Sequence, residues 1–337
     1  MKPTRRDYCQ FILSSQINYT QTYFADHHPH FSHDAINRYL QDDNVTPEEL
    51  WNSVKDVIEY DDDACLIFDD SVLDKNHAHK IDLVRLQYSG NAHRLIKGIG
   101  LVNCLYVNLR TGRYWVIDWR VYAPDEDHKT KLAHAKEMFD NAIHSKKLRF
   151  RTVLMDSWYA TKELMKHLHA SAKLFYCPLK SNRKVDDSGG EEPYKAVSEL
   201  QWTSEQAAHG KLVKVHGFPG DFKLKLFRVA VENSRTEWIV TNDFSQDSTD
   251  GTREMCAVRW KIEQYHREVK QALGIEKCQC RSARAQRNHI GCAMLVWVHL
   301  SDLARKLKKN ICRIKKEMLS SYMKQELKNP SVRMAHV

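Results

Sequence analysis

The chain lacks any long hydrophobic run. Apolar stretches such as Met294–Val298 are far shorter than the roughly 20 residues that a membrane-spanning helix needs. The basic first residues, 1–8, are not followed by the apolar segment of a secretory signal peptide. We therefore expect no membrane segment and a cytoplasmic location.

Metal-binding cysteine patterns and internal repeats are also missing from the sequence. The nine cysteines are scattered, and only Cys278 and Cys280 lie close together, with no second pair near them. An odd, unpatterned set of this kind is typical of reduced thiols in a cytoplasmic protein rather than of a disulfide framework or a zinc site.

Positive charge, in contrast, is in excess. The 337 residues hold 52 Lys and Arg against 43 Asp and Glu, a formal charge of +9, with a pI of about 9.0. Residues 301–337 alone hold ten Lys and Arg against three Asp and Glu, a net +7. A basic surface suits a polyanion, and charge this one-sided favours contact with a DNA backbone over a solvated helix face.

The pattern of apolar residues divides the chain into five segments. They are a helical N-terminal segment and probable DNA-binding module (1–62), the first part of an α/β core (63–178), a β-rich insertion (179–250), a helical completion of the core (251–300) and a basic helical C-terminus (301–337). Strands that alternate with helices predict the α/β class, with a mixed sheet flanked by helices.

The expected helices and strands follow from periodicity and capping residues. Ser32 is a candidate N-cap, and Thr46-Pro47-Glu48-Glu49 has the cap, proline and acids that open a helix. The short N-terminal helices suit either a DNA-binding module or a packing appendage, and both remain open. We expect helices over 8–23, 34–40, 129–145, 158–169, 254–273 and 289–309, and strands over 64–68, 99–107, 114–121, 150–155, 172–177, 211–216, 223–231 and 238–241.

Two of the expected strands run into aspartates. The apolar run 64–68 ends in Asp69 and Asp70, and the run 150–155 ends at Asp156. Carboxylates at neighbouring ends of buried strands lose hydration and repel each other, unless a cation such as Mg²⁺ binds between them. We choose Asp70 over Asp69, because side-chain alternation directs Asp69 to the other side of the strand. Alternatively, each aspartate simply caps the helix that follows it.

The helix expected over residues 254–273 carries a third carboxylate. At about 100° per residue, Arg259, Glu263 and Lys270 fall within about 40° of one another on its surface. An acid flanked by two cations is what a site needs where a DNA backbone meets a catalytic ion. The alternative is an ordinary surface helix with spaced ion pairs.

Together these motifs resemble the bacterial insertion-sequence transposases with an RNase H-like core, in the group marked by a Tyr–Arg–Glu–Lys signature. The first acid of that group lies in an Asp-Asp-Thr/Ser turn, matched by Asp69-Asp70-Ser71, and the second in a turn matched by Asp156-Ser157-Trp158-Tyr159. The third is matched by Arg259-Trp260-Lys261-Ile262-Glu263, with the signature lysine at Lys270. The signature tyrosine position holds Cys256, and a thiol cannot stack or hydrogen-bond to phosphate as a phenol does.

The resemblance, over roughly residues 30–300, implies an RNase H-like fold and a DNA transposase. Such an enzyme would hydrolyse a phosphodiester at the element's end and then use the freed 3′-hydroxyl to attack target DNA. Two Mg²⁺ ions, with Mn²⁺ as a substitute, would be held by Asp70, Asp156 and Glu263. The partners would be double-stranded terminal repeats and target DNA, bound by a homodimer associated with the nucleoid. The candidate DNA contacts are Arg259, His266, Arg267 and Lys270.

Two other functions remain open from the residues alone. An RNase H-like nuclease would cut DNA without joining strands. An inactive DNA-binding derivative would have lost the reaction, although the presence of all three acids argues against it.

Overall fold

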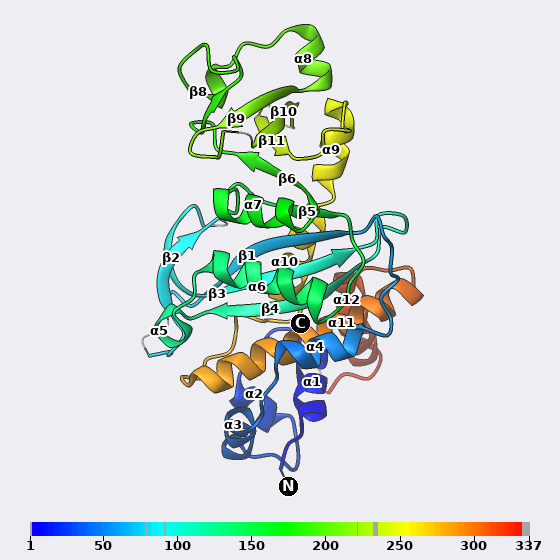
Figure 1. Ribbon diagram of the computed structural model, residues 1–337. Coiled ribbons are helices and arrows are strands. Elements are labelled where there is room, and N and C mark those ends of the chain that lie inside the picture. Colours follow the sequence, from blue (N-terminus) through cyan, green and yellow to red (C-terminus); the bar gives the residue numbers. More distant parts are fainter. Residues whose placement is uncertain (1, 78–79, 91, 221, 232–234, 332–337) are drawn as a thin grey trace, which may run out of the picture. The chain divides into compact units, whose positions relative to one another are not determined.

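The computed structural model describes residues 2–77, 80–90, 92–220, 222–231 and 235–331 (Figure 1). The chain groups into two compact units. Unit 1 comprises residues 1–57, 71–101 and 264–337, and unit 2 comprises residues 58–70 and 102–263. Within the described ranges, no helix is long and apolar enough to cross a membrane.

Unit 1 is built around the long helix α11 (Ala283–Lys306). Three N-terminal helices pack against it: α1 (Arg5–Ser14), α3 (His33–Asp42) and α4 (Pro47–Val54) (Figure 1). The unit also holds α2 (Gln21–Asp26), α12 (Ile311–Lys328), and β2 (Arg85–Ser89) paired with the start of β3 (Arg94–Val107).

The helix caps predicted from the sequence are present. The Ser32 hydroxyl accepts the N–H of Ala35 at the start of α3. Thr46 and Glu49 form a reciprocal capping box at the start of α4. A single helix over residues 8–23 is wrong, because the backbone becomes extended at Ser15 and the next helix begins only at Gln21.

Buried polar groups of α11 tie the N-terminal helices to it. The amide nitrogen of Asn288 donates to the carbonyls of Leu40 (2.8 Å) and Asp43 (2.6 Å), and its oxygen accepts the N–H of Val45 (2.8 Å). The Tyr8 hydroxyl bonds to Nδ1 of the neighbouring residue His289 at 2.9 Å. These contacts favour a packing role for the N-terminal helices, and a separate DNA-binding module over residues 1–62 stays a prediction.

Unit 2 contains the strands that carry the aspartates. β1 (Cys65–Asp74) lies between β3 and β5 (Thr152–Met155), and β4 (Tyr114–Tyr122) pairs with β3. β1 and β5 are parallel, as are β5 and β6 (Leu174–Leu179). The chain segments that join these parallel strands contain α5 (Pro124–Asp127), α6 (Lys131–His144) and α7 (Lys162–Ala170).

The β-rich insertion continues this same sheet beyond β6 (Figure 1). β11 (Thr236–Thr241) pairs with β6 in the antiparallel direction. The order then runs through β10 (Lys223–Ala230), β9 (Lys211–Val215), β7 (Lys184–Asp186) and β8 (Lys195–Ala196), with the 3-10 helix η1 (Val197–Glu199) and the helix α8 (Ser204–His209) in the connections. The described strands form one 11-stranded mixed sheet, so the expected α/β class, a mixed sheet flanked by helices, is confirmed.

The helix expected over residues 254–273 is two helices. α9 (Thr249–Ala257) ends before α10 (Trp260–Gln271) begins. Between them the N–H groups of Val258 and Arg259 bond to carbonyls only three residues earlier, which tightens the chain and interrupts the α-helical pattern.

We predict that Asn288→Ala lowers the free energy of unfolding by roughly 3 kcal/mol, because three buried backbone groups would lose their partner. Chemical denaturation of the two proteins measures this difference. Lys306→Ala is the control, since this exposed lysine on the same helix pairs with Asp302 at the surface and should change stability by under ~0.5 kcal/mol. Equal losses for the two variants would contradict the prediction.

Candidate active site

Asp156 directly follows the buried strand β5, as the sequence predicts. Its Oδ1 accepts the backbone N–H groups of Trp158 (2.9 Å) and Tyr159 (3.3 Å). Burial raises the pKa of the Asp156 carboxyl even though these hydrogen bonds and Arg259 favour the charged form. The turn therefore fixes a desolvated carboxylate at the end of the strand. Because the turn occupies residues 156–159, α7 begins at Lys162 and not at residue 158, where the sequence analysis expected it.

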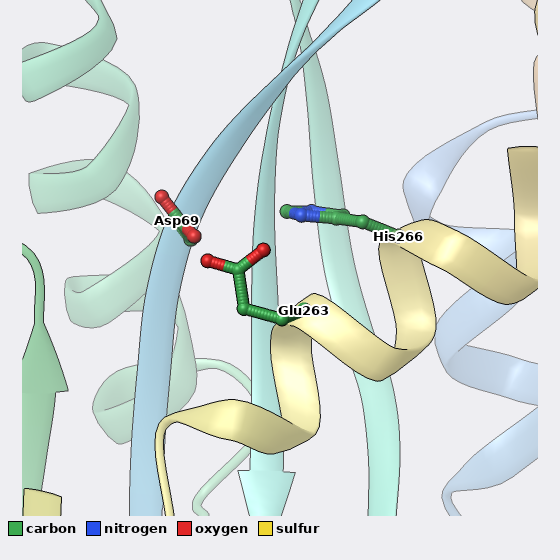
Figure 2. Close-up of side chains that lie close together, drawn as sticks. All are labelled: Asp69, Glu263 and His266. Atoms are coloured by element: carbon green, nitrogen blue, oxygen red, sulfur yellow. The ribbon is translucent and has the colours of Figure 1, made fainter. Parts of the chain in front are cut away.

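The carboxylates of Asp69 and Glu263 lie close together. Figure 2 shows their side chains turned toward each other, with oxygens within 4.8 Å. Asp69 is only 8% exposed. Burial, followed by the charges of Asp156 and Glu263, raises the pKa of the Asp69 carboxyl well above its usual value. Asp69, Asp156 and Glu263 are thus electrostatically coupled in unit 2, and the charge of Asp70 also raises the pKa of Asp69 and of Asp156.

Asp70 points to the other face of β1. Its Oδ2 lies 2.5 Å from the ammonium of Lys131 on α6, and its Oδ1 accepts a 3.4 Å hydrogen bond from the Tyr159 hydroxyl. Alternation does separate Asp69 from Asp70, and Asp69 is the one that faces Glu263, but the charge of Asp70 still raises the pKa of Asp156, so the choice of Asp70 as the catalytic aspartate stays a prediction. The sequence contains no signal for this choice, because it does not say which face of the strand α10 covers.

The basic residues expected around Glu263 have different environments. The Arg259 guanidinium lies 3.6 Å from the Glu263 carboxylate, within the carboxylate group. In unit 1, the Lys270 ammonium donates to the Val72 carbonyl at 2.8 Å, and Arg267 is exposed.

His266 follows Glu263 by one turn of α10 (Figure 2). It is buried, and burial together with the charge of Lys270 lowers the pKa of its imidazole to about 3. The ring is therefore neutral at physiological pH. A neutral, buried imidazole does not suit the phosphate contact expected of it.

The position of the signature tyrosine also lies in unit 2. Cys256 lines an apolar cavity of about 200 Å³ together with Met155 and Trp260. Burial raises the pKa of its thiol to about 12, so the sulfur stays neutral. Tyr265, a phenol on the following helix α10, is fully buried in unit 1 and packs edge-on against Trp297.

The donor set fits a hard divalent cation. Asp69, Asp156 and Glu263 supply carboxylate oxygens, which Mg²⁺ prefers. A cation among them would offset the repulsion that raises the pKa of Asp69.

A family model described as a transposase DDE domain matches residues 63–298. No curated protein matches the sequence. Among solved structures, the piggyBac transposase synaptic complex with hairpin DNA is similar at 11% identity and a TM-score of 0.49, over 97% of this chain and 72% of that chain. Endonuclease V of Ciona intestinalis, in complex with inosine-containing DNA, is similar at 9% identity and a TM-score of 0.35, over 66% of this chain and 96% of that chain.

We predict that Asp69→Asn stabilises the metal-free protein, because it removes a buried charge that is repelled by its neighbours. The melting temperature in a chelating buffer should rise by about 2 °C or more, the shift that ~1 kcal/mol produces in a large domain. Added Mg²⁺ should stabilise the wild-type chain more than the variant. Asp62→Asn, at an exposed position, is the control and should change neither value. A lower melting temperature for Asp69→Asn in the chelating buffer would count against the repulsion.

Proposed function

Because this chain belongs to the family of transposases with a DDE domain and is a DNA transposase, we propose that Asp69, Asp156 and Glu263 are its catalytic acids. Two observations support this set. Carboxylate oxygens of Asp69 and Glu263 lie within 4.8 Å of each other, and the charge of Asp156 raises the pKa of Asp69. The sequence-based set held Asp70 in place of Asp69. In our proposal Asp70 becomes a positioning residue, because it is paired with Lys131 on the other face of β1.

Enzymes of this family use divalent metal ions, and our proposal for this chain is a pair of Mg²⁺ ions, replaceable by Mn²⁺. The three carboxylates would hold them. Bound there, the ions would activate water and later the 3′-hydroxyl, and would stabilise the negative charge on the reacting phosphate.

The chain's own residues position the acids and the DNA. The N–H groups of Trp158 and Tyr159 hold Asp156 in a fixed orientation, so that it does not have to be ordered when substrate binds. Arg259 pairs with Glu263 at 3.6 Å, and its planar guanidinium can bind a phosphate through two parallel hydrogen bonds. When Glu263 is engaged by a cation, Arg259 is free to make that contact.

The proposed partners are the double-stranded ends of the element and the target DNA, bound by a homodimer. Arg259, Arg267 and Lys270 are the proposed DNA contacts on and next to α10. His266 is left out of this set, because its imidazole is buried and neutral.

We predict that Asp69→Asn, Asp156→Asn and Glu263→Gln each reduce DNA cleavage below detection while DNA binding remains. Each substitution removes a ligand charge without opening a cavity. The assay is incubation of the full chain with labelled DNA carrying the flanking element ends and Mg²⁺ or Mn²⁺, scoring nicks, hairpins and joined products. Nicks without joined products from the wild-type chain would favour the nuclease alternative over strand transfer.

Asp70→Asn is the matched control for Asp69→Asn, since the two residues are adjacent and the chemical change is the same. We expect it to retain cleavage, with a loss of about 10- to 100-fold at most, the range for a residue that acts through a ligand. Full loss in Asp70→Asn with activity in Asp69→Asn would restore the sequence-based set.

We predict that Arg259→Ala weakens binding of cleavable DNA and lowers the slope of log affinity against log salt by about one unit, because one phosphate contact is lost. Arg259→Lys should restore the slope but not the full affinity, since an ammonium cannot hold phosphate bidentately. Salt titrations by fluorescence anisotropy measure both quantities. An unchanged slope in Arg259→Ala would show that this guanidinium does not face DNA.

A further inference from the structure

The two closely spaced cysteines of the chain, Cys278 and Cys280, lie together in unit 1. They occupy the irregular segment that joins α10 to α11. Their thiols are hydrogen-bonded to each other. Cys278 is buried, whereas Cys280 is partly exposed. The proposed catalytic acids lie in unit 2, so the proposed function leaves this pair of thiols unexplained. We name it the Cys278–Cys280 pair.

The backbone of this segment brings the two cysteines to the spacing of a disulfide. The side-chain nitrogen of Gln286 on α11 donates to the carbonyls of both, at 3.1 Å for Cys278 and 2.6 Å for Cys280. Because the two carbonyls converge on one nitrogen, the segment curves around it. A disulfide needs Cα atoms about 4 to 7 Å apart, a range that a short curved segment satisfies. The sulfurs can therefore be joined with little movement of the backbone.

A buried cation favours the charged form of these thiols. Lys75 is only 3% exposed, and its ammonium donates to the carbonyls of Glu276 (2.7 Å) and Cys278. The hydrogen bond from Cys280 lowers the pKa of the Cys278 thiol, and the charge of Lys75 lowers it further, although burial acts in the opposite direction. The same hydrogen bond raises the pKa of Cys280. Cys278 therefore loses its proton first and becomes the thiolate, the nucleophilic form of cysteine.

The Cys280 sulfur has a second partner in an N-terminal helix. The side-chain nitrogen of Gln21, at the start of α2, lies 2.9 Å from it. The same nitrogen bonds to the side-chain oxygen of Asn37 on α3 at 3.3 Å. These contacts hold Cys280 beside Cys278, so the second thiol is in place when the first has reacted.

Cys9 and Cys292 are another close pair of thiols in unit 1. The Cys9 sulfur lies 3.9 Å from the carbonyl oxygen of Cys292. A hydrogen bond with Cys292 and the charge of Arg5 lower the pKa of Cys9. Arg5, however, is already paired with Asp43 and Glu49, which offset its charge. We therefore assign the reactivity to the Cys278–Cys280 pair.

We propose that the Cys278–Cys280 pair is a reversible thiol–disulfide site that a small peroxide oxidises. The Cys278 thiolate attacks one oxygen of hydrogen peroxide, and the O–O bond breaks. The second oxygen leaves as hydroxide, takes up the thiol proton and becomes water, and Cys278 is then a sulfenic acid. The Cys280 sulfur attacks this sulfur, the S–S bond forms, and the hydroxyl leaves with the Cys280 proton as water. Two electrons thus pass from the thiols to the peroxide.

The burial of Cys278 selects the oxidant. This residue is only 2% exposed, so a small peroxide reaches its sulfur more readily than a bulky disulfide such as oxidised glutathione. The adjacent Cys280 converts the sulfenic acid to a disulfide before a second peroxide oxidises it further. Disulfides of this kind are transient in a reducing compartment, which fits the reduced thiols expected from the sequence.

The test uses the full chain, reduced and then freed of reductant. The protein is treated with a small excess of hydrogen peroxide, its free thiols are alkylated, and it is digested with trypsin. Cleavage after Lys277 and Arg281 releases residues 278–281, a peptide that holds both cysteines of the pair and no other cysteine. Mass spectrometry should show that this peptide has lost two hydrogen atoms and is not alkylated. Dithiothreitol added before alkylation should reverse both changes.

Cys280→Ser separates the two steps. Because it removes only the second thiol, Cys278 should stop at the sulfenic acid, which dimedone traps. Cys278→Ser should give neither a disulfide nor a dimedone adduct in the 278–281 peptide. Cys312→Ser is the matched control, since this exposed cysteine lies outside the pair and its loss should leave oxidation of the peptide unchanged. Circular dichroism confirms that each variant is folded.

Lys75→Met tests the cation. It should slow formation of the disulfide at neutral pH by about tenfold, because a smaller fraction of Cys278 is then thiolate. Lys97→Met is the matched control, since it removes the same charge at an exposed position of the same unit and should keep the wild-type rate. Equal rates for the two variants would overturn the role of Lys75. The oxidation of the wild-type chain is measured independently of how Lys75→Met folds.

A 278–281 peptide that is fully alkylated after peroxide treatment would overturn the proposal. So would a sulfinic acid at Cys278 with Cys280 alkylated, because the second thiol would then have failed to act. A cross-link between the peptides that hold Cys9 and Cys292, with the 278–281 peptide unchanged, would also overturn it. Failure of the proposed function is distinguishable, since these measurements use neither DNA nor a metal ion.

Discussion

The constraint on which the site depends is the close placement of three carboxylates in a desolvated part of unit 2. Burial and the charges of Asp156 and Glu263 raise the pKa of Asp69, so the group costs stability when no cation is bound. The backbone prevents the charges from moving apart, because β1 and β5 are hydrogen-bonded parallel neighbours. Phe68 of β1 pairs with Met155 of β5, so Asp69 within β1 and Asp156 after β5 occupy the next position of the two strands. The surrounding apolar core must offset the cost of this preformed site.

The acids of this region are compensated unequally. Asp156 accepts two backbone N–H groups, Glu263 has the guanidinium of Arg259, and Asp70 has the ammonium of Lys131. Asp69, in contrast, accepts only the N–H of its neighbour Asp70 among the described residues. A cation would therefore gain most free energy beside Asp69, and for this reason our proposal gives the two adjacent aspartates separate roles. Asp70 pairs with Lys131, but its charge still adds to the repulsion that raises the pKa of Asp69 and of Asp156.

The sequence predicted the class of the fold because buried strands and capped helices leave local signals. Ser32 and the Thr46–Glu49 capping box are present where the pattern placed them. The features that the sequence did not predict depend on tertiary contacts. Alternation separates Asp69 from Asp70, but which face α10 covers is decided by packing far away in the chain. The break at residues 258–259 is likewise invisible to apolar periodicity, since both sides of it keep the same helical spacing. The sequence also could not tell that the insertion continues the core sheet, because an edge strand has the same pattern whichever sheet it joins.

The cations of unit 2 differ in whether they already form an ion pair, and in our proposal this difference affects how DNA is bound. Binding energy from cations away from the reacting phosphate is the same before and after the bond breaks, so it favours neither substrate nor product. Lys180 directly follows β6 and Lys184 begins β7; neither has an ion-pair partner among the described residues, so they would suit this constant attraction. Arg259 differs, because it already pairs with Glu263 and reaches a phosphate only by giving up that partner. In our proposal, its contact with DNA would therefore be coupled to the occupancy of the carboxylates. Under this proposal the unpaired lysines would contribute to affinity alone, whereas Arg259 would engage phosphate only when the carboxylates hold a cation.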